Sequence, residues 1–133
     1  MSTDPHLKDL SDRQARMKLP SRGLPERPAA ERARDFNEVY LPVDESWAIY
    51  EASRCIQCAE PAPCQMACPA RNDIPRAMSL IARGNFLEAA AVYRKTSSLP
   101  EICGRVCPQE RLCNAACVRC RSGEPVLTGA LEF

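Results

Sequence analysis

Nine cysteines gathered in two short bursts constrain this 133-residue chain more than any other feature of its sequence. The first burst has the spacing C-x2-C-x5-C-x3-C-P, and the second has C-x3-C-P-x4-C-x3-C-x2-C. Thiolates separated by two residues in a turn converge on one metal centre, as they do in zinc and iron–sulfur sites. The bursts therefore predict metal ligation by some or all of Cys55, Cys58, Cys64, Cys68, Cys103, Cys107, Cys113, Cys117 and Cys120.

Composition limits where such a protein works and what it binds. The N-terminus lacks the apolar stretch of a secretory signal, and no run of about 18 apolar residues predicts a membrane-spanning helix. We therefore expect a cytoplasmic protein without membrane insertion, in which thiols stay reduced and disulfides are disfavoured. The formal net charge of +1 gives no strong attraction to nucleic acid. Nine cysteines in a reducing compartment indicate metal rather than a disulfide framework.

The spacing of the cysteines favours iron–sulfur clusters over zinc. Structural zinc takes two closely spaced pairs around one ion, and the gaps of five and three residues here do not form such pairs. His6, the only histidine, lies in the N-terminal region, far from both bursts in the sequence. Zinc is kept as the main alternative metal.

The cysteine before a proline has a particular meaning in iron–sulfur proteins. In two-cluster bacterial ferredoxins this cysteine ligates the other cluster. By that rule, Cys55, Cys58 and Cys64 hold one cluster, and Cys68 reaches a second one. For the second burst the spacing leaves two arrangements open. Either three of its cysteines serve the second cluster, or one of them returns to the first.

Helix signals surround the bursts, and neither strands nor an internal repeat are predicted, so the expected fold is a small all-α domain. Apolar residues at helical spacing, N-capping side chains and a C′ glycine mark the helices. The expected helices run from the N-cap Asp44 to Cys55, from an N-cap at Asn72 or Asp73 to the C′ residue Gly84, from the N-cap Asn85 to about Thr96, and from Gln109 to Ala116.

Prolines predict the irregular parts of the chain. Residues 59–64 are expected to form a loop, the segment between Pro100 and Pro108 is expected to be irregular, and residues 124–133 form a turn that begins another helix. Residues 1–43 are charged and proline-containing, so they are either a flexible tail or an extended arm that orders on a partner. In the second case Phe36 and Tyr40 are its anchors. Residues 44–133 form the helical domain.

Six stretches within residues 32–133 carry a family resemblance. They are RARDFNEVYLP (32–42), EASRCIQC (51–58), CQMACPARNDIP (64–75), LIARGNFLEAAAVY (80–93), LPEICGRVCPQERLCNAACVR (99–119) and EPVLTGALEF (124–133). Together they resemble the N-terminal iron–sulfur domain of the glutamate synthase small subunit, which is also found in dihydropyrimidine dehydrogenase and related NAD(P)H-dependent oxidoreductases. The resemblance implies a small helical, ferredoxin-like domain held together by two [4Fe–4S] clusters.

The resemblance also implies a ligand for each iron–sulfur position. The first cluster takes Cys55, Cys58, Cys64 and Cys117. The second takes the three cysteines Cys68, Cys107 and Cys113, and its fourth ligand is not a cysteine but Glu132.

The eighth ligand is the least usual part of this assignment. In dihydropyrimidine dehydrogenase it is a glutamine in the segment matching TGALEF, and Glu132 stands at the corresponding place here. A carboxylate is a harder donor than a thiolate, so it is expected to change the potential of the second cluster. Cys120 is the alternative eighth ligand. Cys103 is expected to be a small buried residue without a ligand role.

The implied function is electron transfer. The chain contains no G-x-G-x-x-G motif and no nucleophile–base pair, so it is expected neither to bind FAD or NAD(P)H nor to be an enzyme on its own. We expect single electrons to pass through the two clusters between a flavin/NAD(P)H oxidoreductase partner and another redox centre. The alternatives are a docking subunit with redox-silent clusters, a zinc-stapled adaptor, and a fragment of a longer flavoenzyme.

Overall fold

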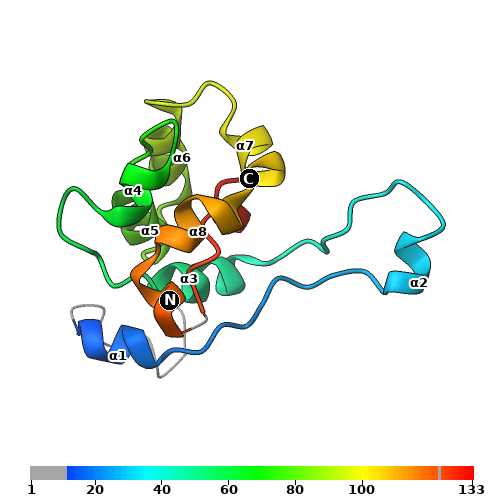
Figure 1. The fold of residues 1–133 in the computed structure, drawn as a ribbon, viewed down its shortest axis with the longest axis horizontal. Coiled ribbons are helices and arrows are strands. Elements are labelled where there is room, and N and C mark those ends of the chain that lie inside the picture. The colour runs from blue at the N-terminus through cyan, green and yellow to red at the C-terminus, as the bar shows by residue number, and fades with distance from the viewer. Residues whose placement is uncertain (1–11, 123) are drawn as a thin grey trace.

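The computed structural model describes residues 12–122 and 124–133, which form short helices joined by loops (Figure 1). Residues 1–11 of the predicted arm, including His6, lie outside the described residues. Within the described ranges the only β-type pairing is an isolated bridge between Glu26 and Tyr40, so the all-α prediction is confirmed. The helices are α1 Arg13–Lys18, α2 Ala29–Arg32, α3 Glu45–Ser53, α4 Pro63–Ala67, α5 Ile74–Ile81, α6 Phe86–Arg94, α7 Pro100–Val106 and α8 Cys113–Ala116, with 3-10 helices η2 Gln109–Arg111, η3 Val118–Ser122 and η4 Gly129–Leu131.

The N-termini of two predicted helices follow from their capping carboxylates. Asp44 accepts a hydrogen bond of 2.7 Å from the backbone N–H of Trp47 at the start of α3. Asp73 accepts one of 3.2 Å from the backbone N–H of Arg76 at the start of α5, so Asp73 rather than Asn72 is the cap. These bonds satisfy backbone donors that have no partner inside a helix.

The hairpin between α5 and α6 turns at Gly84, as predicted. Gly84 has a φ of 78°, in the left-handed region that favours glycine. Its N–H donates to the carbonyl of Ile81, and the N–H of Asn85 donates to the carbonyl of Leu80, at 2.8 and 2.9 Å. This pair of bonds is the Schellman arrangement that ends a helix and reverses the chain.

Three predictions about the regions around prolines were wrong. Helix α4 begins at Pro63, inside the predicted loop, and α7 occupies most of the predicted irregular segment from Pro100. A proline in the first turn is compatible with a helix because its missing N–H would have no helical partner there. The predicted helix over 109–116 is divided into η2 and α8 at Leu112, which has a φ of −118° and a ψ of −112°.

The core lies between α5 and α6, with α3 and the C-terminal segment packed against them. Ile74, Met78 and Ile81 of α5 are buried, and Val92 and Tyr93 of α6 face them. The three α5 residues are spaced by four and three residues, and the buried Ala89 of α6 lies three and four residues before Val92 and Tyr93, so each helix has one apolar stripe. Five cysteines, Cys55, Cys64, Cys68, Cys113 and Cys117, pack against this core, so the candidate ligands border the best-packed part of the domain.

The described part of the predicted arm has two different regions. Near α1, Leu19 is buried and its backbone carbonyl accepts hydrogen bonds from Arg54 and Arg119, so this region is attached to the helical domain. Residues 27–37 project away from the other helices with α2 at their tip (Figure 1). Phe36 is fully exposed on this projection. The division of the chain at residue 43 stays a prediction.

Candidate metal centre

One cavity brings four predicted ligands together. Cys55, Cys58, Cys64 and Cys117 line it, together with apolar side chains of the core. The first three come from the end of α3, the following loop and α4, and Cys117 comes from the end of α8. The structure therefore places one cysteine of the second burst with three of the first, which spacing alone did not decide.

Burial and mutual repulsion both act on the thiols of this first group. The pKa of Cys64 is raised to about 12, mainly by burial and also by the neighbouring Cys55, Cys117 and Cys58, which oppose a further negative charge. Burial likewise raises the pKa of Cys55 to about 11, partly offset by a backbone N–H of Gln57. A group of thiols that resists ionisation is one that a bound cation would stabilise as thiolates.

A second group gathers Cys68, Cys107, Cys113 and Glu132. Burial raises the pKa of Cys113, and both Cys68 and Glu132 add to that effect. Burial also raises the pKa of Cys107, with contributions from Cys103, Glu132 and Cys68. Cys68 and Glu132 thus act on both Cys107 and Cys113.

Helices α4 and α8 contribute to both groups because each has a cysteine at either end. Cys64 lies in α4 and Cys68 caps its C-terminus, whereas Cys113 begins α8 and Cys117 caps its C-terminus. The two helices contact each other, and Cys64 joins Cys117 while Cys68 joins Cys113. The exchange of ligands between groups therefore comes from the pairing of these two short helices.

The Cys-Pro dipeptides have a local physical effect. A residue before proline is disfavoured in the helical conformation, so the helix ends there. Cys68 and Cys107 have extended backbone angles, with ψ values of 123° and 137°, at the ends of α4 and α7. Cys117 adopts the same geometry, with a ψ of 130°, although Val118 follows it. Each of these three cysteines is therefore the C-cap residue of its helix.

Glu132 is oriented by a short relay of polar side chains. The Asn72 side-chain amide donates a hydrogen bond of 3.0 Å to Glu132 Oε1, and the Thr96 hydroxyl donates one of 2.5 Å to Asn72 Oδ1. Burial raises the pKa of Glu132 to about 7, against the lowering effect of the Asn72 bond. Asn72 is itself buried. A half-buried carboxylate held by a buried amide differs from an ordinary solvated glutamate.

Gly104 allows the C-terminal segment to reach the second group. A Cβ built at Gly104 would lie 2.8 Å from the backbone oxygen of Gly129 and 3.0 Å from the backbone nitrogen of Phe133. These are backbone atoms, which cannot move aside without shifting the segment that carries Glu132. The glycine in the Cys-Gly-Arg-Val-Cys-Pro stretch is therefore required by a close approach of α7 and η4.

The two spare cysteines have different surroundings. Cys103 is half-buried beside Cys107, and its sulfur lies 3.8 Å from the Ser97 hydroxyl oxygen. Cys120 is exposed and belongs to η3. Their assignment as spares stays a prediction, and Cys103 is less buried than expected.

Two further polar residues act on the cysteines and were not predicted from the sequence. The Thr128 hydroxyl donates a hydrogen bond of 3.0 Å to Cys113 Sγ. Arg119, which is almost fully buried, lines the cavity of the first group, and its pKa is lowered by burial and by Arg54 but raised by Cys117. A buried guanidinium at this cavity would offset negative charge on the thiolates. No spacing signal marks either residue.

The donor sets fit iron–sulfur clusters. Thiolates are the usual ligands of such clusters, and other donors can replace one or two of them. The first group offers four thiols around one cavity, and the second offers three thiols and a carboxylate. Among the described residues, no three His, Cys, Asp or Glu side chains are arranged to hold a single metal ion.

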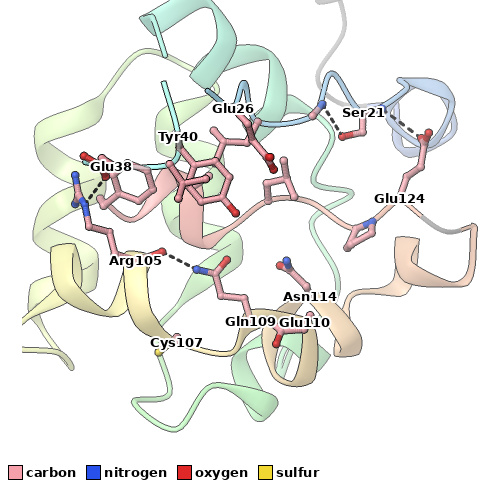
Figure 2. Close-up of a pocket in the computed structure, with 18 residues that line it drawn as sticks. Ser21, Glu26, Glu38, Tyr40, Arg105, Cys107, Gln109, Glu110, Asn114 and Glu124 are labelled. Carbon is pink, nitrogen blue, oxygen red and sulfur yellow. Dashed lines mark hydrogen bonds and ion pairs between the residues drawn. The ribbon is translucent and has the colours of Figure 1, made fainter. Parts of the chain in front are cut away.

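The second group also borders an open cavity of about 740 Å³ (Figure 2). Cys107 lies at its edge, below the arm residues Glu38 and Tyr40, and Arg105 forms an ion pair of 2.9 Å with Glu38 across it. Gln109 donates a hydrogen bond of 2.7 Å to the backbone carbonyl of Gly104. Thus the second group has a side that faces an opening, whereas the cavity of the first is lined mainly by core residues.

Within residues 12–122 and 124–133, no helix is long and apolar enough to cross a membrane.

Comparison with known proteins agrees with this site. Residues 32–133 match the model of a family described as dihydropyrimidine dehydrogenase domain II, 4Fe-4S cluster. The NADPH glutamate synthase small chain of Azospirillum brasilense is 45% identical over 107 residues, which cover 80% of this chain and 22% of that protein. The corresponding small chain of Halomonas elongata is 43% identical over 106 residues, with the same two coverages. The NAD-dependent dihydropyrimidine dehydrogenase subunit PreT of Escherichia coli (strain K12) is 42% identical over 85 residues, covering 64% of this chain and 20% of that protein. The chain thus spans about a fifth of the length of these relatives.

Proposed function

Because the chain belongs to the 4Fe-4S family of dihydropyrimidine dehydrogenase domain II, we propose that it conducts single electrons through two [4Fe–4S] clusters. When bound, such clusters accept and release one electron at a time. The observation that carries the proposal is the division of the donor side chains into two adjoining groups that share α4 and α8. The proposed ligands are Cys55, Cys58, Cys64 and Cys117 for the first cluster and Cys68, Cys107, Cys113 and Glu132 for the second.

The chain's own residues set the spacing of the two positions. Cys64 and Cys68 are four residues apart, as are Cys113 and Cys117, and four residues rise about 6 Å along a helix. Two pairs of ligands fixed at this separation hold the cluster positions close together. Burial against the core keeps water away from the first group, and Thr128 donates a hydrogen bond to Cys113 in the second.

We also propose that a flavin- and NAD(P)H-binding oxidoreductase exchanges electrons with this domain. The printed names of the relatives refer to NADPH and NAD, and the chain corresponds to about a fifth of those proteins. The opening beside Cys107 and the exposed Phe36 on the projecting arm give such a partner a place to approach the second group. Co-purification of a flavoprotein with the tagged chain from its native source would support this. Recovery of the chain alone under gentle conditions would contradict it.

Metal analysis and electron paramagnetic resonance test the function. We expect about eight iron and eight sulfide per chain, and a reduced-state signal that appears with dithionite and disappears on reoxidation. Zinc in place of iron would contradict both the cofactor and the electron-transfer role. Iron-loaded protein without any dithionite-dependent signal would instead indicate redox-silent clusters that organise an interface.

A pair of substitutions separates the two candidates for the eighth ligand. Glu132→Ala is expected to reduce the iron content to roughly half, because the second cluster loses one of its four ligands. Cys120→Ser is expected to keep the full iron content, since Cys120 is exposed in η3. Iron and sulfide per chain, measured after anaerobic purification, give the answer. The opposite result, iron loss only in Cys120→Ser, would assign the ligand to Cys120.

A further inference from the structure

Tyr93 carries a buried hydroxyl that forms no hydrogen bond with any described residue. Its side chain is 2% exposed, and it belongs to the apolar core formed by α5 and α6. The hydroxyl oxygen is buried without a partner. Buried hydroxyl groups in native proteins nearly always have a partner, so this orphan requires an explanation.

The position of Tyr93 supplies one. The charged or ionisable groups that act on its hydroxyl are Glu132 and Cys113 of the second ligand group and Cys55 and Cys64 of the first, with Glu132 the strongest. Tyr93 also belongs to the core against which Cys113 of the second group and Cys55 and Cys64 of the first group pack. Burial raises the pKa of Tyr93 well above its ordinary value, so the phenol keeps its proton and can donate it in a hydrogen bond.

The neighbouring polar groups are already engaged. The Asn72 amide donates to Glu132, and the Thr128 hydroxyl donates to Cys113. The Thr96 hydroxyl donates to Asn72. These bonds show that the Glu132 carboxylate and the Cys113 sulfur already serve as acceptors in this region, and both keep lone pairs for a further donor.

We propose that the Tyr93 hydroxyl donates a hydrogen bond to the second iron–sulfur cluster or to its ligand Glu132, and that this bond raises the cluster's reduction potential. The inference rests on the proposed function, because it needs the second cluster in place. A reduced cluster carries one more negative charge than an oxidised one, so a donor beside it stabilises the reduced state more. Tyr93 thus acts on the charge of the second cluster through a hydrogen bond and is not one of its ligands.

Tyr93→Phe tests this role, since it removes the hydroxyl and keeps the ring that fills the core. At a fixed potential, we expect the ratio of reduced to oxidised second cluster to fall about tenfold. For one electron this corresponds to a midpoint lower by about 59 mV. Potentiometric titration followed by electron paramagnetic resonance measures the midpoint of each cluster. The second cluster's signal is identified as the one altered by Glu132→Cys, which exchanges its carboxylate for a thiolate.

Tyr50→Phe is the matched control. Tyr50 is also buried, but its hydroxyl donates to the backbone carbonyl of Pro20 at 3.0 Å, away from both ligand groups. This variant is expected to leave both midpoints unchanged. A shift as large as that of Tyr93→Phe would mean that losing any buried hydroxyl perturbs the potentials, and would overturn the assignment.

Thermal unfolding of the iron-loaded protein gives a second readout. If the Tyr93 hydroxyl has no partner, Tyr93→Phe removes an unsatisfied group and raises the melting temperature; if it is bonded as proposed, the melting temperature falls. Unchanged midpoints, or a shift confined to the first cluster, would overturn the inference. Wild-type protein without iron would refute the proposed function itself, so the two failures are distinct.

Discussion

Removal of iron by a chelator under anaerobic conditions is expected to abolish most of the helical circular dichroism of this protein. Helices α4, α7 and α8 have 5, 7 and 4 residues, far too few to be stable alone in water. Each of them carries candidate ligands, so cluster binding and helix formation are coupled. Even α5 and α6, with 8 and 9 residues, depend on packing against a core bordered by cysteines.

Far-ultraviolet circular dichroism before and after chelation measures this effect. Reconstitution with ferrous iron and sulfide should restore the lost signal, which controls for irreversible damage by the chelator. A metal-free protein with an unchanged spectrum would show that the helices are independent of the clusters. In that event the small apolar core alone would be sufficient for folding.

Substitution of Arg54 by Met is expected to destabilise the iron-loaded protein by about 3–5 kcal/mol. Glu51 lies in the last turn of α3 and Arg54 is the C-cap of that helix, and both side chains are completely buried. Arg54 Nη1 lies 2.5 Å from Glu51 Oε1. Glu51 Oε2 has no partner within the described residues. Removing the guanidinium therefore leaves a buried carboxylate whose only remaining hydrogen bond from the described residues comes from the backbone N–H of Leu127, at 2.9 Å.

The same substitution also removes the hydrogen bonds that hold two other segments of the chain against α3. Arg54 donates to the backbone carbonyls of Leu19, Glu124 and Pro125, which belong to the N-terminal region and to the C-terminal segment. These bonds cross from one side of the domain to the other. Loss of Arg54 is therefore expected to loosen the segment that leads to Glu132, in addition to the electrostatic cost.

Arg94→Met provides the matched control for Arg54→Met. Arg94 pairs with Glu101 on the surface, and both side chains are exposed, so this change should cost much less stability than Arg54→Met. Chemical denaturation of the iron-loaded variants measures both free energies. Combining Arg54→Met with Glu51→Leu should recover part of the stability, because the buried charge is then removed. Equal losses for Arg54→Met and Arg94→Met would show that the buried pair has no special role.

Helix boundaries were predicted well where capping chemistry sets them. Asp44, Asp73 and Gly84 perform the predicted capping functions, because a carboxylate before a helix and a left-handed residue after it act within a few residues. The predictions failed around Pro63 and Pro100, which were interpreted as breakers. The same residue type stops a helix or starts one depending on whether the preceding turn is helical, and that depends on packing.

The sequence by itself determined the chemistry of this protein. Two bursts of cysteines, the Cys-Pro dipeptides and the matching stretches identified a 4Fe-4S domain, because ligand type and local turn geometry are properties of neighbouring residues. Beyond the ligand sets that the family resemblance implied, only the tertiary structure showed how these donors come together. Cys113 and Cys117 lie in different groups because α8 packs beside α4, and Glu132 reaches the second group because Gly104 lets two backbones touch. These are contacts between residues distant along the chain, and no local pattern encodes the path by which they come together.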